Sequence, residues 1–239
     1  AVVNVFGAGY IPEGCTWQDR FSQKSTQEVS QWNNLIDPKN FLATQKAPIL
    51  FMTWTNDHCY YLPTFQKSYE EISAPKKIIL IANGRHQFTP EMQAVVFQWL
   101  NNKLKNTGRT FPEVKIEAME KKNERLIIPA TIIANVNKSP TLYYSPGQLN
   151  HWTSRKWQPI YGYQEDGIWY FAIPLRTVQS EGVFYVTAYD AFGAATSSLV
   201  RSITRLILPN GEISYALTSP IKKVNVHEMP FQVLGIKGL

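Results

Sequence analysis

Three short apolar runs in the first half of the chain constrain its fold more than any other feature. They cover residues 1–7, 48–54 and 76–83, and each is apolar almost throughout instead of alternating with polar residues. Strands buried on both faces have this composition, and parallel sheets bury their strands in this way. The stretches between the runs can hold helices, so the pattern predicts parallel strands joined by helical connections.

Two segments of this half have the spacing of amphipathic helices. Residues 62–73 carry apolar or aromatic side chains three and four positions apart. Residues 89–106 begin with Thr89, which can cap a helix, and with Pro90, which suits the first helical position. The apolar stripe of this second segment consists of Val95, Val96, Trp99, Leu100 and Leu104. These helices and the apolar runs together predict an α/β region.

The character of the sequence changes near residues 108–113. Beyond them the chain contains about seven short strand-like segments separated by turn residues, with clear alternation at 169–173 and 184–189. This pattern is typical of a β-sandwich of roughly immunoglobulin size. We therefore expect an α/β domain at residues 1–110 and an all-β, immunoglobulin-like sandwich at residues 111–239.

Composition narrows the classes of function. The chain of 239 residues has a net charge of +6, but its basic residues are scattered without a run of five or more, so we expect no nucleic-acid partner. No stretch approaches 18 apolar residues, so we expect no membrane span. The sequence begins inside an apolar run and without Met, which leads us to expect a preceding segment.

Asp57 and His86 are the candidate catalytic residues. Asp57 follows the second apolar run and His86 the third, and the carboxyl ends of neighbouring parallel strands meet at one edge of a sheet. One interpretation is ordinary: an Asp after a strand often starts a turn, and His86 is a turn histidine. The other is that they are the acid and base of a Ser–acid–His triad, which has this chain order in one large class of hydrolases.

The nucleophile of such a triad is missing. The sequence contains no Gly-x-Ser-x-Gly motif, and Cys15 lacks the flanking residues of a nucleophile turn. Cys15 and Cys59 follow neighbouring strands, so we expect them to lie close together, with a disulfide as one possible state. A disulfide would suit a periplasmic or secreted protein.

The other polar candidates have ordinary interpretations. Asp37 precedes a proline and is predicted to be a turn or cap residue, and His58 to be a loop residue. His151 and His227 have no acid or cysteine at metal-ligand spacing, so we predict neither a metal site nor a cofactor. Three tryptophans of the second half favour either core packing or a surface that stacks on sugars. They are Trp152, Trp157 and Trp169.

Two stretches resemble a known family. "APILFMTWTNDHCYYLPTFQKSYEE" and "ANGRHQFTPE" are similar to the second half of bacterial α/β-hydrolases of the dienelactone-hydrolase and acetylxylan-esterase-like group. "AVVNVFGAGYIPEG" resembles the strand and loop after the nucleophile helix of such proteins, and "LYYSPGQLNHWTSRKWQ" resembles part of their C-terminal β-sandwich. The resemblance implies a partial parallel α/β-hydrolase sheet, with Asp57 as triad acid and His86 as triad base. Trp54 stands where the family has Gly.

By this resemblance the serine and the oxyanion-hole loop precede Ala1. The chain is then the C-terminal portion of a serine hydrolase for carboxylic esters, with acetylated glycans as one possible substrate and the N-terminal half as its partner. Alone, it is expected to hydrolyse nothing and to leave the outer edge of its first strand unpaired. The alternative is a non-catalytic module that binds a glycan or a protein through the β-sandwich.

Overall fold

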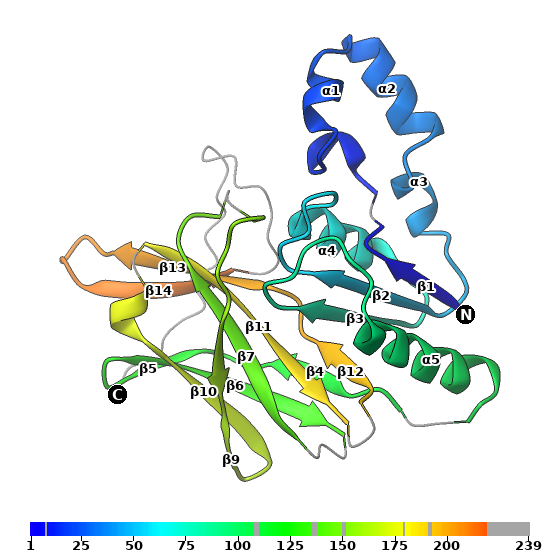
Figure 1. The fold of residues 1–239 in the computed structure, drawn as a ribbon. Helices are drawn as coiled ribbons and strands as arrows, with labels where there is room; N and C mark the ends of the chain where they lie inside the picture. Colours follow the sequence, from blue (N-terminus) through cyan, green and yellow to red (C-terminus); the bar gives the residue numbers. More distant parts are fainter. Residues whose placement is uncertain are drawn as a thin grey trace. The chain divides into compact units, whose positions relative to one another are not determined.

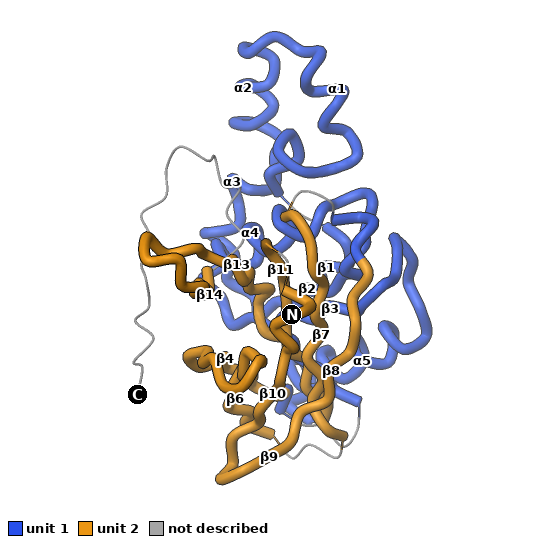
Figure 2. Tube along the Cα trace, turned by 90° about the vertical axis from the view of Figure 1, so that its left-hand side faces the viewer, with its two compact units in different colours: residues 1–111, 152–155, 192–197 blue, residues 112–151, 156–191, 198–239 orange. Residues whose placement is uncertain are grey.

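The computed structural model describes residues 1–7, 9–107, 110–134, 138–149, 152–178, 180–190 and 193–218 (Figure 1). The chain forms two compact units (Figure 2). The first consists of residues 1–111 with two returning segments, 152–155 and 192–197, and the second of residues 112–151, 156–191 and 198–239. The predicted division into domains after residue 110 stays a prediction.

The first unit contains a parallel sheet of three strands. Its order is β1 (Val2–Val5), β2 (Ile49–Trp54) and β3 (Lys76–Ile81), which are the three apolar runs. β2 lies in the middle and is buried along almost its whole length, as its continuous apolar composition predicts. Among the described residues β1 pairs only with β2.

Helices connect and cover these strands. Between β1 and β2 lie η1 (Ile11–Glu13), α1 (Gln18–Ser22), α2 (Thr26–Leu35) and α3 (Lys39–Leu42); α4 (Leu62–Glu71) precedes β3 and α5 (Pro90–Leu104) follows it. Both helices predicted from periodicity are present. Thr89 caps α5 by accepting a hydrogen bond from the Met92 amide, and Pro90 takes the first helical position.

The second unit consists almost entirely of antiparallel strands. They are β4 (Glu113–Ile116), β5 (Glu120–Lys122), β6 (Arg125–Ile133), β7 (Lys138–Pro146), β8 (Gln158–Tyr161), β9 (Tyr163–Glu165), β10 (Ile168–Pro174), β11 (Glu181–Tyr189), β13 (Arg201–Ile207) and β14 (Ile213–Thr218), with the short η2 (Leu175–Thr177). One sheet has the order β4-β6-β10-β9, with β5 also on β6, and the other β14-β13-β11-β7-β8. Leu126, Phe171 and Phe184 belong to a core cluster to which both sheets contribute. β12 (Ala195–Ser197) belongs to the first unit, where Ser197 bonds the Leu80 amide of β3.

The predicted fold class, a partial parallel α/β-hydrolase sheet followed by an immunoglobulin-like β-sandwich, is wrong. The described residues are mostly β-structure in antiparallel sheets, and the one parallel sheet has only three strands, which is not an α/β-hydrolase core. The reason is physical: a continuous apolar run shows that a strand is buried on both faces, but not how many strands share its sheet. The coarser expectation of a β-rich second half is confirmed.

The three tryptophans of the second half are buried. Trp152, Trp157 and Trp169 are 8%, 2% and 9% exposed, which favours packing over a sugar-stacking surface. Trp157 meets the ring of Tyr185 edge-on at 5.2 Å.

Within the described residues no helix is long and apolar enough to cross a membrane.

Candidate functional site

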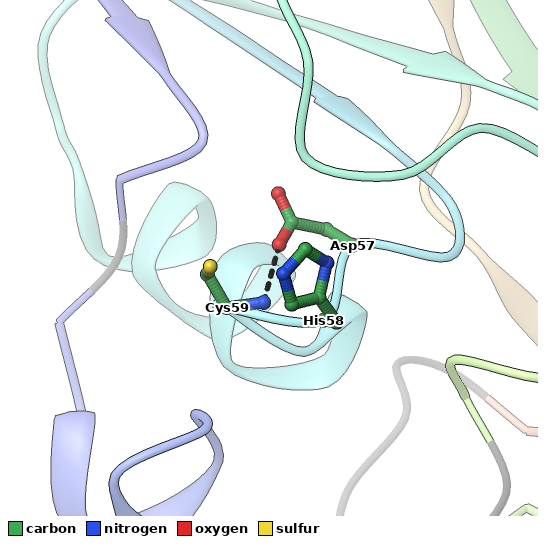
Figure 3. A group of neighbouring side chains, drawn as sticks. All are labelled: Asp57, His58 and Cys59. Carbon is green, nitrogen blue, oxygen red and sulfur yellow. Dashed lines mark hydrogen bonds between the residues drawn. The ribbon is translucent and has the colours of Figure 1, made fainter.

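Asp57 lies in the loop that follows β2, three residues after the strand ends at Trp54. Its side chain is buried, and its Oδ1 accepts a hydrogen bond from the backbone amide of Cys59 at 2.7 Å (Figure 3). The same oxygen accepts the backbone amide of Tyr60 at 3.1 Å. Thr53, inside β2, donates a longer bond to Oδ2 at 3.4 Å. Asp57 is therefore a turn residue, as the ordinary interpretation of the sequence predicts. The same bonds fix the direction of its carboxylate.

The loop after β3 brings His86 to this carboxylate. Asn83 has a left-handed backbone (φ 63°) and its amide bonds the Thr55 hydroxyl at 3.0 Å, which ties the loop to the end of β2. Gly84 lies against the face of the Trp54 ring, where a Cβ would come within 1.8 Å of a ring carbon. Trp54 also donates its indole N–H to the Gln87 carbonyl at 2.7 Å.

The side chains of Asp57 and His86 are in contact. His86 Nδ1 lies 3.0 Å from Oδ2 and 3.2 Å from Oδ1 of Asp57, so the predicted meeting of the two strand ends is confirmed. The histidine side chain is 35% exposed, against 1% for the aspartate. Among the described residues Nε2 of His86 has no hydrogen-bond partner. The imidazole is held from its buried side and open on the other.

Aromatic rings fix the plane of His86. The Phe6 ring, just after β1, lies 4.5 Å from the imidazole at a tilt of 42°. The His58 ring stands edge-on to it at 5.9 Å. Since the Phe6 amide bonds the Met52 carbonyl of β2 at 2.9 Å, all three parallel strands contribute to the support of this histidine.

The two cysteines lie near Asp57 and are both free thiols. The Thr16 amide bonds the Cys59 carbonyl at 3.0 Å, which confirms that the cysteines are near neighbours; the possible disulfide is not formed. Cys15 forms an isolated antiparallel bridge with Tyr60. Burial raises the pKa of both thiols, and nearby Asp57 raises that of Cys59 further. Neither thiol has the lowered pKa of an activated nucleophile.

Sequence reasoning missed one support of the site. Asn56, beside Asp57, is 7% exposed and its amide nitrogen donates to the carbonyls of Arg155 at 2.6 Å and Thr153 at 3.2 Å, in a segment that returns to the first unit. The hydroxyl of Thr55 donates to its side-chain oxygen at 2.8 Å. Three polar residues in a row after an apolar strand are the only local signal that this turn is held by buried hydrogen bonds.

Asp37 has a larger structural role than predicted. It is fully buried, and besides the Lys39 amide expected of a cap its carboxylate accepts the amides of Tyr10 and Ile11, all at 2.9 to 3.0 Å. It thus fastens the loop after β1.

His151 and His227 lie outside the described residues, so the predictions about them are not tested.

A family model described as PhoPQ-activated pathogenicity-related protein matches residues 15–156, a range that includes Asp57 and His86. The chain belongs to this family. This match gives no specific support to the dienelactone-hydrolase and acetylxylan-esterase-like group. None of the curated proteins matches the chain.

Solved structures with some likeness include OgpA from Akkermansia muciniphila. Its catalytically inactive form in complex with an O-glycopeptide (glycodrosocin) substrate is 11% identical with a TM-score of 0.30, and the match covers 77% of this chain and 71% of that one. Wild-type OgpA is 10% identical with a TM-score of 0.30 over the same shares. At such scores the likeness supports no conclusion about this chain.

Proposed function

We propose that Asp57 and His86 are the acid and base of a serine-hydrolase site that cleaves carboxylic esters. The serine would come from a segment outside these 239 residues. The observation that carries the proposal is the asymmetric placement of the pair. The acid is buried and contacts one ring nitrogen at 3.0 Å, and the other ring nitrogen is left open.

This arrangement prepares the imidazole for proton transfer. A carboxylate that accepts the Nδ1 proton selects the tautomer with a lone pair on Nε2, the nitrogen that can take the proton of a serine hydroxyl. The negative charge beside the ring also stabilises the imidazolium that then forms. Asp57 can hold this position because two backbone amides already fix its other oxygen.

The thiols near the pair do not supply the nucleophile. Burial raises the pKa of both, which keeps them protonated, and the sulfur of Cys15 is occupied by bonds to the Ile11 carbonyl at 3.0 Å and the Trp17 amide at 3.3 Å. The sequence also has no serine in a Gly-x-Ser-x-Gly turn. A hydroxyl from elsewhere in the natural polypeptide, or from a second chain, is the nucleophile that fits this pair.

The test uses the natural polypeptide that contains this sequence and p-nitrophenyl acetate as the ester. His86→Ala and Asp57→Asn are each expected to lower kcat by about 10³-fold or more, because a triad without base or orienting acid loses proton transfer. Asp19→Asn, an exposed aspartate of α1, is the matched control and should keep the native rate. A fluorophosphonate probe should label one serine, more slowly in the His86 variant. Native kcat in both site variants would refute the proposal.

A binding function of the second unit is a second candidate, and exposed tyrosines favour it. Tyr161 and Tyr163 are 72% and 55% exposed, and Tyr163 stacks on Tyr170 with 5.5 Å between centroids. Flat exposed rings of this kind can stack on sugars. Retention on an acetylated xylan gel that is lost in Tyr163→Ala would support this candidate, and no retention of the native protein would exclude it for that glycan.

A further inference from the structure

The loop after β2, whose Asp57 contacts His86, also brings together three different metal-ligand groups. One donor atom each from Asp57, His58 and Cys59 lie within 4.8 Å of one another (Figure 3). The carboxylate is buried, the thiol is intermediate and the imidazole is exposed. The turn that brings them together is the one closed by the bond from the Cys59 amide to Asp57 Oδ1.

We propose that this loop is a regulatory site for a thiophilic divalent cation of the Zn²⁺ type. The ligands would be Cys59 Sγ, an imidazole nitrogen of His58 and a carboxylate oxygen of Asp57. A mixed set of thiolate, imidazole and carboxylate is the set that Zn²⁺ takes in proteins, and the sulfur disfavours Mg²⁺ and Ca²⁺, which prefer oxygen ligands alone. When the sulfur–metal bond forms, the thiol proton leaves to solvent.

The three donor atoms are already almost as close together as the ligands of a bound Zn²⁺ ion. Ligands of one tetrahedral Zn²⁺ at its usual bond lengths lie about 3.3 to 3.8 Å apart, so the donors need to close by about 1 Å. His58 can supply most of this movement, because its side chain is exposed and forms no hydrogen bond within the described residues, its ring contact being the edge-on one with His86. The backbone of the turn can stay where it is.

Asp57 makes this cation a competitor of His86. Oδ1 already accepts two backbone amides, whereas Oδ2 accepts the longer Thr53 bond and lies nearest to His86 Nδ1, at 3.0 Å. We therefore infer that Oδ2 is the oxygen that binds the ion. A cation on Oδ2 therefore removes the acceptor that orients the imidazole. Inhibition of ester cleavage by the ion follows, a consequence that rests on the proposed hydrolase function, whereas the binding itself does not.

Cys15 provides the matched control. It is the other free thiol of the chain and lies close to Cys59, but it is 2% exposed and its sulfur already bonds the Ile11 carbonyl and the Trp17 amide. It is not part of the ligand group. Cys15→Ser should therefore leave cation binding unchanged, although it removes one thiol just as Cys59→Ser does.

The binding experiment titrates the reduced protein with Co²⁺ and measures Zn²⁺ affinity by competition with a chromophoric chelator. The native protein and Cys15→Ser should bind one ion and show thiolate-to-cobalt absorption. Cys59→Ser should lose that absorption and roughly tenfold or more of the affinity, and the surface variant His58→Asn should lose affinity but keep the absorption. Absorption that persists in Cys59→Ser, or Zn²⁺ affinity equal in native, Cys59→Ser and His58→Asn proteins, would overturn the site.

The activity experiment separates this inference from the proposed function. Zn²⁺ should inhibit p-nitrophenyl acetate hydrolysis by the native protein, and Cys59→Ser should need roughly tenfold more ion for the same inhibition. Tight binding without inhibition of an active enzyme would overturn the competition for Asp57. Tight binding in a protein that cleaves no ester would refute the hydrolase function and leave the cation site standing.

Discussion

Replacement of Asp57 should destabilise the folded protein much more than replacement of His86. Asp57→Ala removes the charged acceptor of the Cys59 and Tyr60 amides, and each such bond contributes about 1.5 to 3 kcal/mol. The expected loss of unfolding free energy is about 3 to 6 kcal/mol. His86→Ala removes a ring that is 35% exposed and leaves the turn intact, so its expected cost is about 1 kcal/mol or less.

Urea unfolding followed by tryptophan fluorescence measures the two losses, and Asp57→Asn separates the turn from the charge. Asparagine keeps one oxygen for the two amides, so its loss should fall between those of the two alanine variants. Hydrogen exchange of the Cys59 and Tyr60 amides gives the local measure, and only the Asp57 variants should accelerate it. If Asp57→Ala costs no more than His86→Ala, the carboxylate does not hold the turn and the argument fails.

Two further predictions concern the support of the site and the buried phenols. Gly84→Ala forces a methyl group into the Trp54 ring and should lower the free energy of unfolding by on the order of 1 to 3 kcal/mol. Ester cleavage should also fall, because His86 shifts with the loop. The exposed control Arg85→Ala should be neutral, and urea unfolding measures both variants. Burial raises the pKa of Tyr69 and Tyr189 to about 12, so their stabilisation is complete below pH 10, the ordinary tyrosine pKa, and is lost as pH rises toward 12. Phenolate absorbance should show them titrating only as the protein unfolds.

The sequence contained enough to bring Asp57 and His86 together. Each follows an apolar run, and the ends of neighbouring parallel strands share one edge whatever the rest of the sheet contains. Helix α5 could also be predicted, because Thr89 and Pro90 mark its start. Its predicted apolar stripe is right only in part: Val95 and Trp99 are buried, but Leu104 is 65% exposed. These predictions depend only on residues close in sequence or on the pairing of two neighbouring strands.

The prediction that failed, and the contact that was not predicted, both depend on distant parts of the chain. The number of strands in a sheet is set by which segments find each other, and three apolar runs produced a sheet of three strands and not a larger α/β core. The amide of Asn56 bonds carbonyls 97 and 99 residues further along, at Thr153 and Arg155. No local pattern in either segment indicates that pairing, because carbonyl groups are present at every residue.

The two proposals, ester cleavage and cation binding, both depend on the geometry of a single carboxylate. One oxygen of Asp57 is committed to the turn by two backbone amides, and these bonds also keep His58 and Cys59 beside it. The other oxygen can orient His86 or bind an ion, but a positively charged ion there repels the imidazolium that catalysis requires. The two occupants therefore exclude each other even if both could reach the oxygen. A variant that tightened cation binding without touching His86 should become easier to inhibit by the same factor, since the two equilibria share one site.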